Sequence, residues 1–247
     1  MTNYTTMKKV LLCAIASLVL AGCQNNSEQE LVGDMGRIAI DFSTSGEVDT
    51  RADGILLENL PTPADFTLKI SGAATDENTS AFSKEWSSFA GYNYEEERLF
   101  HGLYNVALTY GDPTVEGYNK PAFVGASNDF QIVPRSEVEV PITATIANAL
   151  VVVEVTDSFK KYFTSGYTFD VVTEAGNTFD NVTAEEGENA GKPLFIAPAS
   201  FKVTGEATKQ ANQSGVQPTV VKMEHNFTNV AARTIYRVKM DVDTAGE

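Results

Sequence analysis

Apolar and polar residues alternate along most of this chain, a pattern typical of β-strands that bury one face. In residues 37–43 the alternation places Ile38, Ile40 and Phe42 on a single face. Residues 138–146 have a longer apolar face, formed by every second side chain. The same reasoning predicts further strands at 66–70, 99–111, 130–133, 150–155, 167–173, 177–182, 194–196, 200–206, 218–223 and 233–242.

Short strands separated by turn residues at intervals of roughly 8–12 residues predict an all-β protein of antiparallel β-sandwiches. Helical periodicity is almost absent, and a single helical turn is predicted over 157–163. Residues 150–155 are apolar on both faces apart from one glutamate, as expected of a central strand. We place a boundary near Ala147, which gives two tandem domains over 36–146 and 147–247.

The N-terminal segment has the three zones of a secretory signal peptide. A pair of lysines precedes an uncharged, mostly apolar run over 10–20, which is too short to remain as a membrane-spanning helix. The run ends in Leu-Ala-Gly-Cys, which looks like a bacterial lipobox with Cys23 as the residue that receives the lipid. We therefore expect a cleaved signal peptide over 1–22 and a polar, flexible tether over 23–35.

Charge and cysteine content exclude several classes of partner. The chain has 33 acidic and 18 basic side chains, for a net charge of −15. Such a protein repels nucleic acid and anionic lipid, so attachment to the outer membrane depends on the lipid on Cys23. The other cysteine, Cys13, lies in the signal peptide. The folded part therefore has no disulfide, cysteine nucleophile or thiolate metal site.

The sequence contains no pattern of residues that predicts catalysis. His101 and His225 are the only histidines, and neither has a cysteine or a second histidine nearby in sequence. Phosphate-binding loops, zinc-protease motifs, nucleophile elbows and calcium-binding loops are all absent from the sequence. We expect a protein that is not an enzyme and that needs neither a cofactor nor a metal.

The densest group of aromatic residues lies over 86–94 and includes Trp86, Tyr92 and Tyr94. If these rings are exposed, they could contact a ligand, either by stacking on sugar rings or by binding another protein. If they are buried, they cover one end of a sandwich. The sequence leaves both interpretations open.

Several of these stretches together resemble the fimbrillin-like surface lipoproteins of gut Bacteroidota, in particular a branch known only as a domain of unknown function. The stretches that carry the resemblance are the lipobox, the strand at 37–43, Leu-Tyr-Asn-Val-Ala-Leu-Thr-Tyr-Gly at 103–111, Ala-Phe-Val-Gly at 122–125, the run 138–155 and Phe-Lys-Lys-Tyr-Phe at 159–163. The resemblance implies two transthyretin-like sandwich domains and a relationship to pilus subunits.

In the pilus-forming relatives, a protease cuts after an arginine that follows the first strand, and a strand from the next subunit replaces the one removed. The resemblance places that cut between Arg51 and Ala52 of this chain. The released segment would include the strand at 37–43. The alternative is that Arg51 is an ordinary loop residue and the first strand stays in place.

We therefore expect a lipid-anchored protein of the outer membrane that faces the cell exterior and serves adhesion or pilus assembly. Its expected partners are the membrane, through Cys23, and other pilus subunits. The alternative is a surface lipoprotein that binds glycans for nutrient capture, with Trp86, Tyr92 and Tyr94 as its platform.

Overall fold

The computed structural model describes residues 33–48, 55–73, 81–163, 166–183, 186–209, 215 and 217–242. The chain divides into two units, Met1–Glu30 and Leu31–Glu247, and all described residues belong to the second. Most of that unit is β-strand, which confirms the predicted all-β class. Within the described ranges, no helix is long and apolar enough to cross a bilayer.

The elements of the first part of the unit precede residue 147. The strands are β1 (Met35–Thr44), β2 (Glu47–Val48), β3 (Ile55–Leu56), β4 (Thr67–Gly72), β5 (Phe82–Trp86), β6 (Leu99–Phe100), β7 (Gly102–Tyr110), β8 (Gly117–Tyr118), β9 (Phe123–Ala126), β10 (Phe130–Ile132) and β11 (Glu137–Ile146). Two short 3-10 helices are η1 (Pro63–Asp65) and η2 (Phe89–Gly91).

The elements of the second part begin after residue 148. They are β12 (Ala149–Val155), α1 (Asp157–Tyr162), β13 (Tyr167–Thr173), β14 (Thr178–Phe179), β15 (Leu194–Ile196), β16 (Phe201–Lys209), β17 (Thr219–Phe227) and β18 (Ile235–Met240). The predicted helical turn is confirmed as α1, which begins where the Thr156 hydroxyl accepts a hydrogen bond from the Phe159 main-chain N–H.

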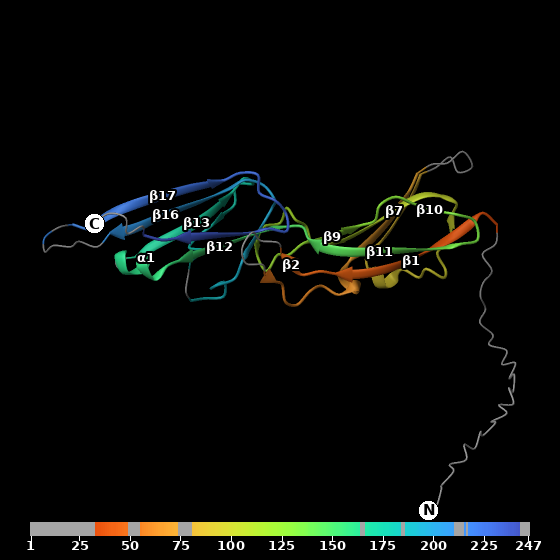
Figure 1. Ribbon diagram of the computed structural model, residues 1–247, viewed down its shortest axis with the longest axis horizontal. Helices are drawn as coiled ribbons and strands as arrows, with labels where there is room; N and C mark the ends of the chain where they lie inside the picture. The colour runs from red at the N-terminus through yellow and green to blue at the C-terminus, as the bar shows by residue number, and fades with distance from the viewer. Residues whose placement is uncertain are drawn as a thin grey trace, which may run out of the picture. The chain divides into compact units, whose positions relative to one another are not determined.

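The first hydrophobic core is enclosed by one sheet with the strand order β5-β4-β7-β9-β11-β1-β6, to which β10 is added by pairing with β7. In Figure 1 the pair β1 and β11 lies opposite β7 and β10, so this sheet folds over its own core. Every second residue of each long strand points inward, as the alternation predicts. The fully buried large side chains of this core are Ile38, Phe66, Leu68, Ile70, Leu108, Phe123, Ile132, Ile146 and Leu150.

The second core lies between two four-stranded sheets, with the orders β18-β12-β15-β8 and β14-β13-β16-β17. Phe169 fills its centre and packs against Phe159, with ring centroids 5.7 Å apart. Gly205 lies opposite Phe169 in the β13–β16 pair, and a Cβ atom at Gly205 would fall 2.3 Å from the ring. The glycine therefore makes room for the aromatic ring on the neighbouring strand.

The prediction of purely antiparallel sheets is wrong at two pairs of strands. β1 runs parallel to β11 along eight residue pairs, and β12 runs parallel to β18 along six. Each pair joins segments that are far apart in sequence. Alternation of side chains reveals that a segment is a strand but not which segment it pairs with, so the sequence could not indicate these directions.

The junction between the two cores is fixed by buried polar contacts. Asn148 is completely buried, and its side-chain oxygen accepts a hydrogen bond of 2.6 Å from the Ala122 main-chain N–H. Its main-chain oxygen accepts a second, of 2.8 Å, from the Arg233 N–H. β8, which precedes the junction in sequence, pairs with β15, which follows it.

Candidate functional site

The first strand, β1, has the features of a separable part of the first core. Its side chains alternate, and Ile38 is completely buried, while Ile40 and Phe42 are half-buried and pack against the same core. Phe42 meets the Phe66 ring edge-on, with centroids 4.8 Å apart. β1 therefore contributes apolar side chains to a core whose other strands all follow it in sequence.

One edge of β1 is paired along most of its length and the other is not. On one edge, β1 pairs with β11 from Arg37 to Thr44. On the opposite edge, β6 pairs only with Met35 and Gly36. Beyond Gly36, a side chain takes over from a strand, because the Tyr92 hydroxyl donates a 2.7 Å hydrogen bond to the Ile38 main-chain oxygen.

The aromatic cluster of 86–94 covers this second edge of β1. Trp86 and Tyr92 are half-buried against the first core and meet edge-on, with centroids 5.1 Å apart. The Lys84 ammonium lies 4.7 Å from the centroid of the Trp86 ring. Tyr94 is 37% exposed, and the Arg37 guanidinium lies 5.5 Å from its ring centroid. Cations therefore occupy ring faces that a sugar would need.

Burial withdraws the Tyr92 phenol from water and raises its pKa above the ordinary range, and the nearby Glu97 carboxylate adds to the shift. An unfolded chain loses the phenolic proton near pH 10, at which the folded chain still keeps it. The unfolded state then binds fewer protons than the folded state, so the free energy of unfolding falls as pH rises above about 10.

For Tyr92→Phe we expect two changes in urea unfolding curves. At pH 8 the free energy of unfolding falls by about 1 kcal/mol, because the hydrogen bond to β1 is lost. Between pH 8 and pH 11 the further decline is smaller than in the native chain, because this phenol no longer titrates. The exposed Tyr94→Phe variant is the control and should follow the native curve. A Tyr92→Phe curve that declines as steeply as the native one would contradict this reading.

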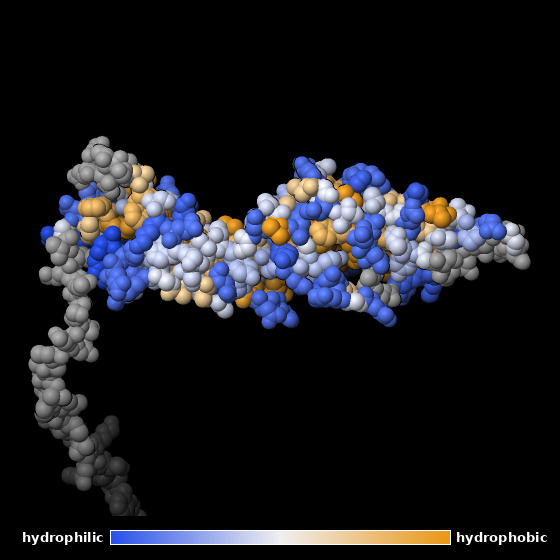
Figure 2. All heavy atoms as spheres, turned by 180° about the vertical axis from the view of Figure 1, so that it is seen from behind, coloured by the Kyte–Doolittle hydropathy of each residue, from blue (hydrophilic) through white to orange (hydrophobic). Residues whose placement is uncertain are grey.

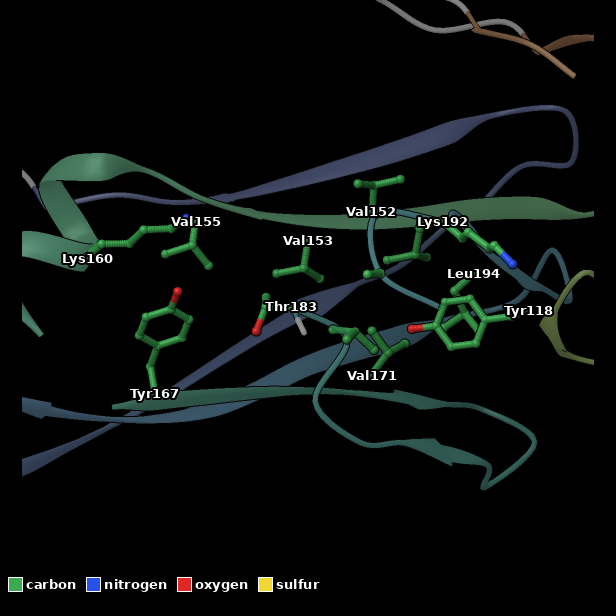
Figure 3. A pocket seen from close by; sticks show the side chains of 14 residues that line it. Tyr118, Val152, Val153, Val155, Lys160, Tyr167, Val171, Thr183, Lys192 and Leu194 are labelled. Carbon is green, nitrogen blue, oxygen red and sulfur yellow. The ribbon is translucent and has the colours of Figure 1, made fainter. Parts of the chain in front are cut away.

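The second core contains a cavity of about 410 Å³ between its two sheets. Figure 3 shows valine side chains of β12 along one side, with Tyr167 and Val171 of β13 on the other and the Tyr118 hydroxyl directed inward. Burial raises the pKa of Tyr118. The polar side chains that line it are Tyr118, Lys160, Tyr167, Thr183 and Lys192, and the lining includes no histidine, cysteine or carboxylate.

The two histidines lie apart from each other and from this cavity. His101 is half-buried directly before β7, and His225 is exposed on β17 with its ring edge-on to Phe227 at 4.7 Å. Among the described residues, no group of three or more histidine, cysteine, aspartate or glutamate side chains is placed to hold a metal ion. On the face shown in Figure 2, apolar side chains form small separate groups among polar ones.

The predicted lipid attachment and cleavage sites cannot be placed in the fold. Cys23, Arg51 and Ala52 all lie outside the described residues, and their roles stay predictions. The structure does define what surrounds the cleavage site in sequence, since residues 49–54 connect β2 to β3. These two short strands pair antiparallel, with Val48 opposite Ile55.

Sequence reasoning missed the polar residues that join the two cores. Glu116 accepts hydrogen bonds from the Thr173 hydroxyl at 2.6 Å and the Asn177 amide at 2.7 Å. Its other carboxylate oxygen accepts one from the Ala197 main-chain N–H at 3.1 Å. These partners are 57 to 81 residues away in sequence, so no local pattern could have identified them.

A protein family described as Domain of unknown function (DUF4493) matches residues 34–247. This chain belongs to that family. The match confirms the predicted membership in a branch known only as a domain of unknown function. The matched range is continuous and includes the residues of both hydrophobic cores. No curated protein is similar enough in sequence to match.

Several solved structures of bacterial proteins show similarity to this chain. A proposed cell adhesion protein of Bacteroides ovatus is 10% identical, with 83% of this chain and 92% of that chain covered and a TM-score of 0.40. One from Bacteroides thetaiotaomicron is 12% identical, with 86% and 95% covered and a TM-score of 0.33. The fimbrial anchor protein Mfa2 of Porphyromonas gingivalis is 10% identical, with 80% and 99% covered and a TM-score of 0.33. At such low identities and TM-scores, the likeness decides nothing about function.

Proposed function

We propose that this chain is a non-enzymatic protein of the outer cell surface, anchored by a lipid on Cys23, that serves adhesion or pilus assembly. The observation that carries the proposal is the position of β1. An apolar strand at the N-terminal end of the fold completes the first core, and it follows directly on the predicted tether. A pull on the tether would therefore act on β1 first.

The arrangement of the rest of the chain supports a mechanical role. Two hydrophobic cores account for most of the buried side chains, consistent with our proposal of two tandem transthyretin-like sandwich domains over 36–146 and 147–247. The boundary is not a flexible linker, because Asn148 forms hydrogen bonds with Ala122 and Arg233, and Glu116 forms one across the boundary with Thr173. Such a junction would transmit force from one core to the other.

Cleavage after Arg51 would release a segment that is still held by non-covalent contacts. The segment would take with it Ile38 and Val48, both of which belong to the first core and are at most 2% exposed. Its removal would uncover the edge of β11 over Glu137–Ala144. An incoming strand could then pair with the same edge, as in the exchange that the resemblance implies.

The anchor can be tested by replacing Cys23 with alanine. In cells that express Cys23→Ala, we expect the protein to leave the membrane fraction and the cells to lose chain-dependent attachment to surfaces, because the lipid on Cys23 is the proposed anchor and the described residues include no helix that could cross a bilayer. The Cys13→Ala variant is the matched control, since Cys13 lies in the apolar run and should not receive lipid. The measurement is immunoblotting of membrane and soluble fractions together with an attachment assay.

If Cys23→Ala remains in the membrane fraction, the proposed anchor is wrong. If the variant is released while attachment of the cells is unchanged, the anchor is right and the adhesive role is wrong.

A further inference from the structure

The strand β17 presents a long sheet edge that no second strand of the described residues covers. It is the last strand in the order β14-β13-β16-β17 and pairs with β16 along all nine of its residues. Among the described strands it has no second neighbour, and Figure 1 shows it at the outer side of its sheet. Edge strands are normally short, interrupted by proline or a bulge, or lined with charged side chains, because a free edge pairs readily with another strand. β17 contains neither proline nor glycine.

Hydrogen bonding fixes which residues of β17 offer main-chain groups at this edge. The Thr208 N–H donates to the Gly166 oxygen on the β13 side, so even-numbered residues of β16 bond toward β13 and odd-numbered ones toward β17. Gly205 pairs with Met223 in the β16–β17 register, so odd-numbered residues of β17 bond to β16. The outward N–H and C=O groups therefore belong to Val220, Lys222, Glu224 and Asn226.

The charges on the outer face of β17 have an order that fits a second copy of the strand. Lys222 and Glu224 are both exposed, and each already pairs with β16: the Lys222 ammonium lies 2.9 Å from Glu206, and the Lys202 ammonium lies 3.7 Å from Glu224. In an antiparallel pair centred on Met223, Lys222 of each copy lies opposite the partner's Glu224. A pair centred on Lys222 would place the two lysines opposite each other, and a pair centred on Glu224 would do the same with the two glutamates.

We propose that two copies of this chain pair through β17, antiparallel and in the register centred on Met223. The contact is isologous, so the same strand is used by both copies and the assembly closes as a dimer. The outward main-chain groups of even-numbered residues meet their counterparts, and the salt bridge between Lys222 of one copy and Glu224 of the other forms twice. On the inner face, the half-buried Met223 side chains lie side by side, which extends the apolar face of both sheets. This pairing does not depend on the proposed surface role.

The register predicts a specific disulfide. Met223 of the two copies would form a non-hydrogen-bonded pair, with Cα atoms about 4.5 Å apart, within the roughly 4.4–6.8 Å that a disulfide accepts. We expect Met223→Cys in the full chain, oxidised in whole cells, to run at twice the monomer mass without reductant. Val221→Cys is the matched control, because its cross-strand neighbour is the partner's His225. The native chain gives the background from Cys13 and Cys23.

Charge variants test the register without relying on the cysteine alone. In the Met223→Cys background, Glu224→Lys should lower the cross-linked fraction at least about tenfold, and so should Lys222→Glu. When these two variants are mixed, opposite charges face each other again and cross-linking should return. In detergent, the native chain should sediment as a dimer and Glu224→Lys as a monomer. Equal cross-linking of Met223→Cys and Val221→Cys, or a monomeric native chain, would overturn the proposal.

Discussion

Replacing Ile38 with aspartate is expected to lower the free energy of unfolding by more than about 4 kcal/mol. Ile38 is completely buried in the first core, on the strand that the proposed function concerns. The substitution removes a large apolar side chain and puts a carboxylate among the apolar side chains of the first core. The cost exceeds that of a simple truncation, because the cavity and the unpaired charge both contribute.

The chain contains a probe for this experiment. Trp86 is its only tryptophan and packs against the first core, so tryptophan fluorescence in a urea titration reports the unfolding of that core. Ser43→Asp is the matched control, since Ser43 lies on the same strand but is exposed. Its free energy of unfolding should stay within about 0.5 kcal/mol of the native value. If Ile38→Asp unfolds at the native urea concentration, β1 is not part of the core.

Replacing Asn148 with alanine is expected to lower the free energy of unfolding by about 2–4 kcal/mol. The variant leaves the Ala122 N–H without its acceptor in a position closed to water, and it also removes a contact of 3.4 Å with the Pro113 oxygen. Because the same residue joins the two cores, we expect the fluorescence and circular-dichroism transitions to separate in this variant, whereas those of the native chain should coincide.

Asn105→Ala is the control for Asn148→Ala. Asn105 is also an asparagine with a side-chain hydrogen bond, of 3.2 Å to Asp129, but it is exposed. Its loss should cost at most about 0.5 kcal/mol, because water replaces the partner. Equal effects of the two substitutions would show that burial of Asn148 does not matter to the junction.

Much of the fold could be predicted from local pattern. The alternation at 66–70 and 138–146 corresponds to β4 and β11, and the predicted turn at 157–163 corresponds to α1. The partners of these strands could not be predicted, because pairing depends on residues up to 100 positions away. The parallel pairs β1–β11 and β12–β18 are the clearest cases.

The candidate site divides in the same way. The sequence identified β1 as an apolar strand and the cluster at 86–94 as aromatic, but it could not decide between a platform and a cover. The structure places the Tyr92 hydroxyl on the Ile38 oxygen, so part of the cluster serves β1. Asn148 and Glu116 gave no signal in the sequence, because an asparagine or glutamate in a loop looks the same whether its partners are water or distant main-chain groups.

The central claim is that this chain is displayed on the outer surface through a lipid on Cys23. The most direct measurement is treatment of intact cells with a protease, together with mass spectrometry of the N-terminus of the native chain. We predict that the protease digests residues 33–242 without cell lysis and that the N-terminus is a lipid-modified Cys23. An N-terminus at Ala52 on the surface would show in addition that β1 is released. A chain that begins at Met1 and is degraded only after lysis would contradict the account.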